Sequence, residues 1–152
     1  LGVIAVNQPN YLHDQGDEFL TRLGERGEWL QPMRAELDAG VRIALSSDAD
    51  VTTYRPLETI ANAVARTTMS GRPIGLEQAL TVEEAVRAHT IYAAFSIFAE
   101  DRLGSIEPGK LADLAVLDGD LFGTTPAAIR DLSVWMTVIG GDIVFGPGGR
   151  VQ

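Results

Sequence analysis

The amino-acid sequence predicts an α/β fold that continues into a mostly β region. Residues 2–6 and 41–45 form two short, continuously apolar runs, which are typical of strands buried within a sheet. Residues 32–39, between them, place apolar side chains at helical spacing, and Gly40 follows as a helix stop. Because a buried strand after a helix favours parallel pairing, we expect a parallel sheet with helices packed on its face.

Further helices are predicted before and after the second strand. Residues 15–27 are polar and indicate an exposed helical excursion or a long loop. A helix over residues 56–70 begins with a proline, which fits a first helical turn because its missing N–H costs nothing there. Thr81 and Glu84 form a capping box at the start of a long helix over residues 81–96.

The character of the sequence changes near residue 103, and the rest of the chain is predicted to be mostly β. Gly140-Gly141, between two apolar runs, is a strong signal for a two-residue hairpin loop. The glycines of residues 146–149 precede no helix, so they do not indicate a phosphate loop. The expected elements are a turn, three strands and a helical interruption, at residues 104–109, 112–117, 134–139, 142–145 and 126–130.

Composition and charge narrow the classes of partner. The chain has 152 residues, 45% of them hydrophobic, and a formal net charge of -9. Its Lys and Arg residues are scattered, whereas phosphate binding needs them clustered, so no nucleic-acid partner is expected. No apolar run approaches the roughly 20 residues of a membrane helix, so no membrane association is expected. The absence of cysteine excludes disulfides and thiolate zinc sites and fits a cytoplasmic protein.

Asp48 is the strongest candidate for metal-assisted chemistry. It lies just past the predicted strand 41–45, and functional residues of parallel sheets and barrels gather at the carboxyl ends of strands. A carboxylate there can ligate a metal, accept a proton from metal-bound water, or do both. The alternative is a turn cap, in which the carboxylate bonds nearby backbone N–H groups, and Asp50 is more simply explained in that way.

The two histidines do not complete a metal site. A catalytic zinc has three protein ligands, commonly including several histidines, yet the chain has only His13 and His89 and no His-x-His pair. His89 shares a helix face with apolar residues, which favours a core or interface histidine. His13 follows the first strand on the functional side of the sheet, where it is a candidate for lining a substrate pocket; an ordinary loop residue is the alternative.

Short motifs occur in a defined order along nearly the whole chain. They are Gln8-Pro9-Asn10-Tyr11, Gly16-Asp17, Leu23-Gly24-Glu25-Arg26, residues 39–48, Glu83-Glu84-Ala85, Thr90 and residues 104–117. Each motif is weak alone, but their order and spacing together are specific. The chain resembles the metal-dependent amidohydrolases of the YtcJ-like subgroup.

That resemblance implies the C-terminal fragment of a (β/α)8 TIM-type barrel plus part of a small β-sandwich. Residues 1–103 would supply the last β/α units of the barrel, and residues 104–152 the C-terminal contribution to the sandwich. Asp48 matches the family's last-strand aspartate, which ligates metal and acts as acid and base toward the hydrolytic water. Gln8 falls at a strand end facing the same pocket, so with His13 it is a substrate-binding candidate. The cofactor implied is a divalent metal, with zinc expected.

The chain departs from the family pattern in what it lacks. The first-strand His-x-His, the mid-barrel Lys or Glu and the later histidines would all precede Leu1 in a full-length protein. The sequence also starts without methionine, directly in a strand-like run. We therefore expect a piece cut from a longer protein, with a mature start after processing as the alternative.

The implied function is metal-dependent hydrolysis of an amide or another C–N bond in a small-molecule substrate by the full-length parent. The fragment itself is expected to be inactive and to bind metal weakly or not at all. Two alternatives stay open: a noncatalytic binding or dimerisation module, and a deaminase of the same superfamily. Unpaired barrel edges invite association, which leaves a homo-oligomer open as well.

Overall fold

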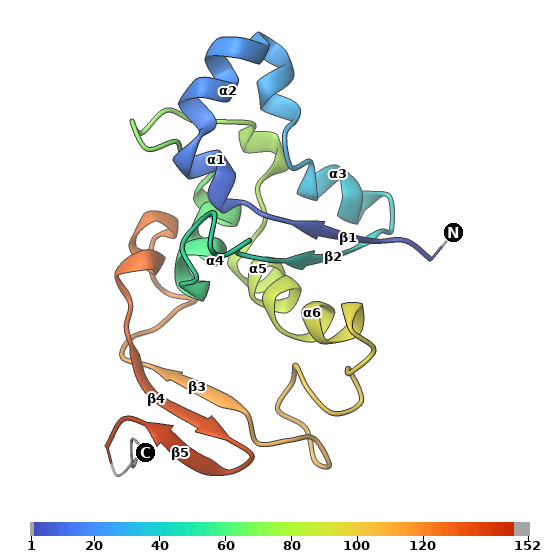
Figure 1. Ribbon diagram of the computed structural model, residues 1–152, viewed down its shortest axis with the longest axis vertical. Coiled ribbons are helices and arrows are strands. Elements are labelled where there is room, and N and C mark those ends of the chain that lie inside the picture. Colours follow the sequence, from blue (N-terminus) through green and yellow to red (C-terminus); the bar gives the residue numbers. More distant parts are fainter. Residues whose placement is uncertain (1, 148–152) are drawn as a thin grey trace.

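The parallel pairing predicted for the two apolar runs is confirmed. The computed structural model describes residues 2–147. In it, β1 (Ile4–Asn7) and β2 (Arg42–Leu45) form a two-stranded parallel sheet (Figure 1). Asn7 pairs with Leu45, so both strands end at the same edge of the sheet.

The connection between these strands is helical over most of its length. Pro9 precedes the first helix with a φ of -64°, the angle that its ring imposes. The second helix has acidic residues in its first turn, where their negative charge interacts favourably with the helix dipole. The helix predicted at residues 32–39 is confirmed, and the polar stretch 15–27 is mainly helical. The segments are α1 (Asn10–Asp14), α2 (Gly16–Leu23), the 3-10 helix η1 (Gly24–Trp29) and α3 (Met33–Asp38).

The helix after β2 is shorter than the sequence predicts. α4 (Pro56–Ala65) begins at the expected proline but ends well before residue 70. Arg66 adopts a left-handed conformation with a φ of 44°, and its buried guanidinium donates to the backbone carbonyls of Leu30 and Gln31, which are remote in sequence, and of the nearby Ile74. The helix ends at this left-handed residue, so the predicted end of α4 is wrong.

The capping box of the following helix is confirmed. One 3-10 turn, η2 (Leu76–Gln78), precedes it. The Thr81 hydroxyl accepts from the Glu84 N–H at 3.2 Å, and the Glu84 carboxylate accepts from the Thr81 N–H at 2.8 Å, at the start of α5 (Val82–His89).

The long helix predicted over residues 81–96 is not continuous. Thr90 has a φ of -121° and a ψ of -91°, which are not helical, and α6 (Ile91–Ser96) follows it. On α6, the Phe95 ring stacks against β2, with its centroid 3.9 Å from the guanidinium carbon of Arg42. Like every other helix in the described residues, α5 and α6 do not have the length and apolar character needed to cross a membrane.

The strands predicted in the last third are confirmed as an antiparallel sheet in the order β3–β4–β5. Ile139 pairs with Asp142 across the Gly140-Gly141 hairpin. The helical interruption is a 3-10 helix rather than an α-helix. Within the glycine-rich tail, residues 148–149 lie outside the described residues. The elements are β3 (Leu114–Leu117), η3 (Pro126–Asp131), β4 (Val134–Ile139) and β5 (Asp142–Phe145).

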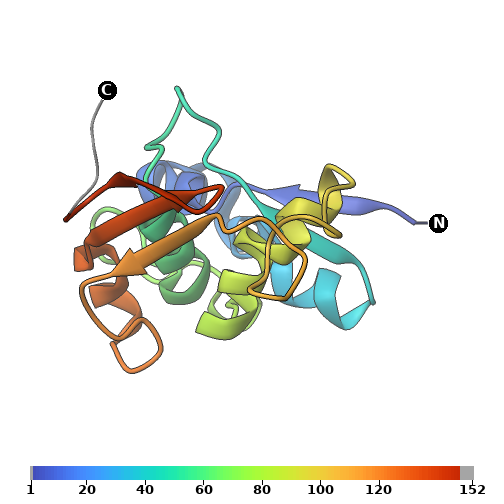
Figure 2. The same ribbon diagram turned by 90° about the horizontal axis from the view of Figure 1, so that it is seen from below.

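One hydrophobic core joins the two predicted parts of the chain. α4 and α5 lie between the parallel pair and the three-stranded sheet, which Figure 2 shows in orange to red alongside the green α4. Ile129 of η3 is fully buried in the same cluster as side chains of β2, α4 and α5. The boundary predicted near residue 103 therefore does not separate two cores, and the division into two domains stays a prediction.

The parallel pair leaves apolar surface uncovered. Val3 and Val6 are 63% and 50% exposed, and β1 pairs with no strand other than β2 among residues 2–147. Strands of parallel sheets are normally covered on both faces. The described structure is therefore a partial α/β unit.

Candidate active site

Asp48 lies just past the carboxyl end of β2, in a turn held by two serine side chains. The Ser46 hydroxyl accepts from the Asp48 N–H at 3.2 Å, and the Ser47 hydroxyl accepts from the Ala49 N–H at 3.3 Å. Asp48 has a φ of 54°, a left-handed conformation that Asp tolerates better than most residues. Its side chain is exposed and accepts no backbone N–H of the described residues. The serines therefore take the capping role that was the alternative explanation for Asp48.

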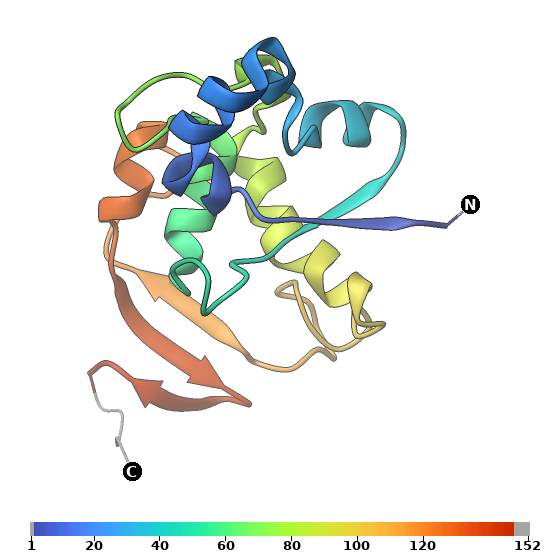
Figure 3. The same cartoon turned by 45° about the horizontal axis from the view of Figure 1, so that its top comes forward.

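The Asp48 carboxylate is instead bonded to a side chain remote in sequence. The hydroxyl of Tyr11, on α1, donates to Asp48 Oδ2 at 2.7 Å, and Figure 3 shows the loop after β2 running beside α1. Oδ1 accepts no hydrogen bond from residues 2–147, so one oxygen is held and the other is free. The hydrogen bond to Asp48, followed by burial and the carboxylate charge, raises the pKa of Tyr11 above its usual value. The sequence alone assigned Tyr11 no role; its signals were its place after the first strand and its membership in the first motif of the resemblance.

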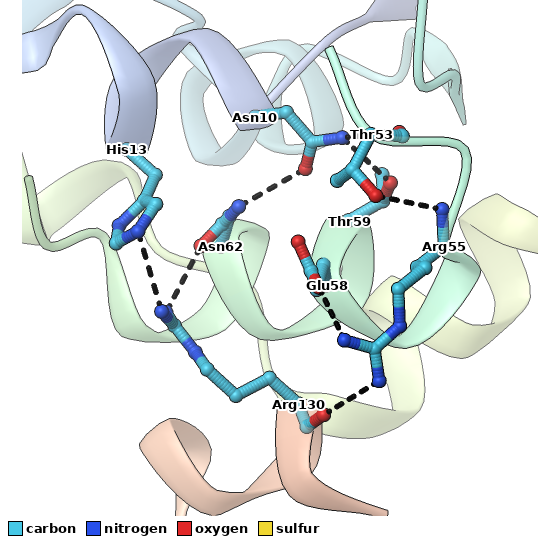
Figure 4. A network of polar contacts seen from close by, with 8 residues as sticks. All are labelled: Asn10, His13, Thr53, Arg55, Glu58, Thr59, Asn62 and Arg130. Atoms are coloured by element: carbon cyan, nitrogen blue, oxygen red, sulfur yellow. Dashed lines mark hydrogen bonds and ion pairs between the residues drawn. The ribbon is translucent and has the colours of Figure 1, made fainter. Parts of the chain in front are cut away.

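Asn10, in the first turn of α1, connects the Asp48 loop (residues 46–55) to α4 through hydrogen bonds. The side chain is 0% exposed, and its Nδ2 lies 3.1 Å from Thr52 Oγ1 and 3.3 Å from the Thr53 carbonyl in the loop. In α4, the same nitrogen lies 3.2 Å from Thr59 Oγ1, and Asn10 Oδ1 accepts from Asn62 Nδ2 at 3.0 Å (Figure 4). One buried amide thus joins the turn after β1, the loop after β2 and α4.

His13 lies on the same helix, with both ring nitrogens engaged within the chain. Nδ1 lies 3.0 Å from the Thr67 carbonyl and so carries the proton, which leaves Nε2 to accept from Arg130 Nη1 at 3.4 Å. Arg130, on η3, also donates to Asn62 Oδ1 at 3.1 Å (Figure 4). No hydrogen bond joins His13 to Asp48 in the described structure. A substrate contact through either ring nitrogen would have to replace one of these bonds.

Gln8 lies at the same strand edge as Asp48. Gln8 follows Asn7 at the end of β1. The Ser46 N–H donates to the Asn7 carbonyl at 2.9 Å, so the segments that continue β1 and β2 stay side by side beyond the paired residues. The backbone N–H of Gln8 donates to Gln31 Oε1 at 3.0 Å. Its half-buried side-chain amide makes no hydrogen bond within the described residues and is available to a ligand.

The described residues offer one candidate metal ligand, Asp48, rather than a complete metal centre. No group of three or more His, Cys, Asp or Glu side chains suited to a metal gathers within residues 2–147. Because a catalytic zinc takes three protein ligands, the free Oδ1 of Asp48 fits one of them. His89 is half-buried on α5, where burial lowers the pKa of its ring, in keeping with a core or interface histidine.

Comparison with known families covers nearly the whole chain. The model of the Amidohydrolase family matches residues 1–145. The chain belongs to the amidohydrolase family. This membership confirms the resemblance carried by the ordered motifs, and a YtcJ protein is among the relatives.

Two relatives show the extent of the match. The N-substituted formamide deformylase of Arthrobacter pascens is 41% identical over 143 residues, which cover 93% of this chain and 26% of that protein. The putative amidohydrolase YtcJ of Bacillus subtilis (strain 168) is 32% identical over 142 residues, which cover 91% of this chain and 27% of that protein. The chain therefore spans about a quarter of the length of these relatives.

The likeness extends to solved structures. An uncharacterized metal-dependent hydrolase from Pyrococcus horikoshii OT3 has a TM-score of 0.70 and 25% sequence identity, and the match covers 82% of this chain and 26% of that chain. This amidohydrolase-family chain thus has the fold of a segment of a metal-dependent hydrolase. The β-sandwich expected from residues 104–152 stays a prediction, because the described part of that region forms one three-stranded sheet and the 3-10 helix η3.

Proposed function

We propose that this chain is the C-terminal part of a longer, metal-dependent hydrolase that cleaves an amide or another C–N bond in a small molecule. The observation that carries the proposal is Asp48, an exposed carboxylate at the strand edge with one oxygen held by Tyr11 and one free. Membership in the amidohydrolase family and the two relatives described above support the reaction class. Zinc is the expected metal, since catalytic zinc sites accept a carboxylate ligand.

Asp48 has two roles in the proposed reaction. A divalent metal, when bound, polarises the substrate carbonyl and lowers the pKa of a water molecule. Oδ1 of Asp48 would be one ligand to that metal and would accept a proton as the water oxygen bonds to the carbonyl carbon. The resulting carboxylic acid then returns the proton to the leaving nitrogen as the C–N bond breaks, so that a neutral amine departs.

The remaining expectations become proposals about the parent protein. The free amide of Gln8 fits a hydrogen bond to a substrate amide, whereas His13 would contact a substrate only by exchanging its bond to Arg130 or to the Thr67 carbonyl. The net charge of -9 supports a small-molecule substrate rather than a nucleic acid. Cytoplasmic localisation, a homo-oligomer and the sandwich formed by residues 104–152 belong to the same proposal.

The proposal is tested by Asp48→Asn in the full-length protein. The first assay substrate is an N-substituted formamide, the class named for the relative that is 41% identical. Asn removes the charge yet tolerates the left-handed backbone of position 48, so kcat/KM should fall by about 10²–10⁴-fold. Asp50→Asn, in the same exposed loop, is the matched control and should change kcat/KM less than about twofold. Near-normal hydrolysis by Asp48→Asn would contradict the proposed role.

A noncatalytic binding or dimerisation module is the second candidate, because the described residues supply a single candidate ligand rather than a set. The 152-residue chain, loaded with zinc and dialysed, should retain no stoichiometric metal and hydrolyse nothing. A gene whose reading frame extends upstream into a His-x-His strand supports the enzyme, whereas a frame that starts near Leu1 supports the module. Ammonia release from an aminated ring substrate would identify a deaminase instead.

A further inference from the structure

Two adjacent residues of α1 hold the Asp48 loop at different points. Asn10 donates to Thr52 and Thr53 in the second half of the loop, whereas the Tyr11 hydroxyl donates to the Asp48 carboxylate in its first half. The Asn10 side chain is fully buried and also bonded to α4 (Figure 4). The first turn of α1 is therefore anchored in the core, so the backbone that carries Tyr11 is held in place relative to Asp48.

Tyr11 is the sole hydrogen-bond partner of the Asp48 carboxylate within residues 2–147. The side chain of Asp48 is exposed, and the terminal torsion of an aspartate is broad unless a hydrogen bond fixes it. The hydroxyl of Tyr11 holds Oδ2 at 2.7 Å and leaves Oδ1 without a partner. Because hydrogen bonds to a charged acceptor are roughly twice as strong as neutral ones, this contact is strong enough to select one orientation.

We propose that Tyr11 is a positioning residue that fixes the orientation of the Asp48 carboxylate, so that one oxygen is bonded to the tyrosine hydroxyl and the other faces the reacting water. The proposal rests on the hydrolase function proposed above and adds a division of labour between the two oxygens. Oδ2 accepts the hydrogen bond from the Tyr11 hydroxyl, and Oδ1 takes part in the reaction. Loss of a hydrogen-bond partner behind a ligating carboxylate typically costs about 10–100-fold in metal affinity or activity, which sets the expected size of the effect.

The first test replaces the hydroxyl and keeps the ring. In the full-length, metal-loaded protein, Tyr11→Phe should lower kcat by about 10–100-fold and change KM less than about twofold, because the substrate contacts are unaltered. The visible spectrum of the cobalt(II)-substituted protein should shift, since the carboxylate of Asp48 is no longer held. The matched control is Tyr54→Phe. Tyr54 lies in the same loop, is 82% exposed and makes no hydrogen bond through its hydroxyl among the described residues, so neither measurement should change.

A double variant separates positioning from direct participation. If Tyr11 acts through Asp48, adding Tyr11→Phe to Asp48→Asn should change residual kcat/KM and the zinc dissociation constant by less than about twofold. An unchanged kcat and cobalt spectrum in Tyr11→Phe, or a full further loss in the double variant, would overturn the positioning role. Failure of the hydrolase proposal is distinguishable, because the wild-type protein would then hydrolyse nothing, and failure of the role of Asp48 would leave Asp48→Asn with normal activity.

Discussion

Replacing Asn10 with alanine should lower the free energy of unfolding by about 3–4 kcal/mol. The side chain is 0% exposed, and its amide lies within hydrogen-bonding distance of groups in the loop after β2 and in α4. Alanine removes both N–H donors and the accepting oxygen from this buried position. It also leaves Nδ2 of Asn62, a residue only 3% exposed, without its partner.

The magnitude follows from ordinary hydrogen-bond energies. Three net hydrogen bonds contribute roughly 3 kcal/mol, and the unpaired amide of Asn62 adds about 1–3 kcal/mol. Two effects offset part of this loss: alanine has a helix propensity better than that of asparagine by roughly 0.5 kcal/mol, and water enters a polar cavity of sufficient size. The net change is a large share of the ~5–15 kcal/mol that stabilises a typical domain.

Urea unfolding of wild type and variants at one pH measures this change. Thr59→Val removes one acceptor for the Asn10 amide and keeps the side-chain shape, so it should cost only about 1 kcal/mol. Gln15→Ala is the matched control, because the Gln15 side chain makes no hydrogen bond in the described residues; its effect should stay within about 0.5 kcal/mol. A loss below about 1 kcal/mol for Asn10→Ala would refute the reasoning, since the three segments would then not depend on that amide.

Two further predictions concern segments beside the site. Hydrogen bonds from Ser70 and Thr68 outweigh desolvation and lower the pKa of Asp17 below 3.8, so its contribution to stability is present above that pH and is lost as pH falls through the lower, folded-state pKa. Asp17→Asn should therefore flatten the acid side of the plot of melting temperature against pH, and an unchanged acid side would contradict this. Arg66→Met deprives three backbone carbonyls of their donor and should destabilise the protein by about 3 kcal/mol or more in urea unfolding. Arg66→Lys should restore little, because one ammonium group lacks the planar fork that reaches all three; full rescue by lysine would count against the geometry.

The sequence predicts some members of the candidate site, such as Asp48, but not the roles of Asn10 and Tyr11. Asp48 could be found because a strand end is a local pattern and because the motif around it resembles a family. Asn10 and Tyr11 stand in the first motif of that resemblance, yet their side-chain partners lie between 37 and 52 residues further along the chain. No spacing within a motif encodes contacts over that range. The role of each could be inferred only once α1 and the loop after β2 were placed side by side.

The sequence alone determined those features whose interactions are complete within a few residues. The capping box at Thr81, the Gly140-Gly141 hairpin and the two apolar strands all match, because backbone preferences and neighbouring side chains suffice to form them. Tertiary structure decided where α4 stops and how the Asp48 carboxylate is held. The helix stops at Arg66, whose guanidinium donates to carbonyls of the remote Leu30 and Gln31, and the carboxylate is held because Asn10 anchors α1 in the core. Both outcomes depend on hydrogen bonds between segments that only the folded chain brings together.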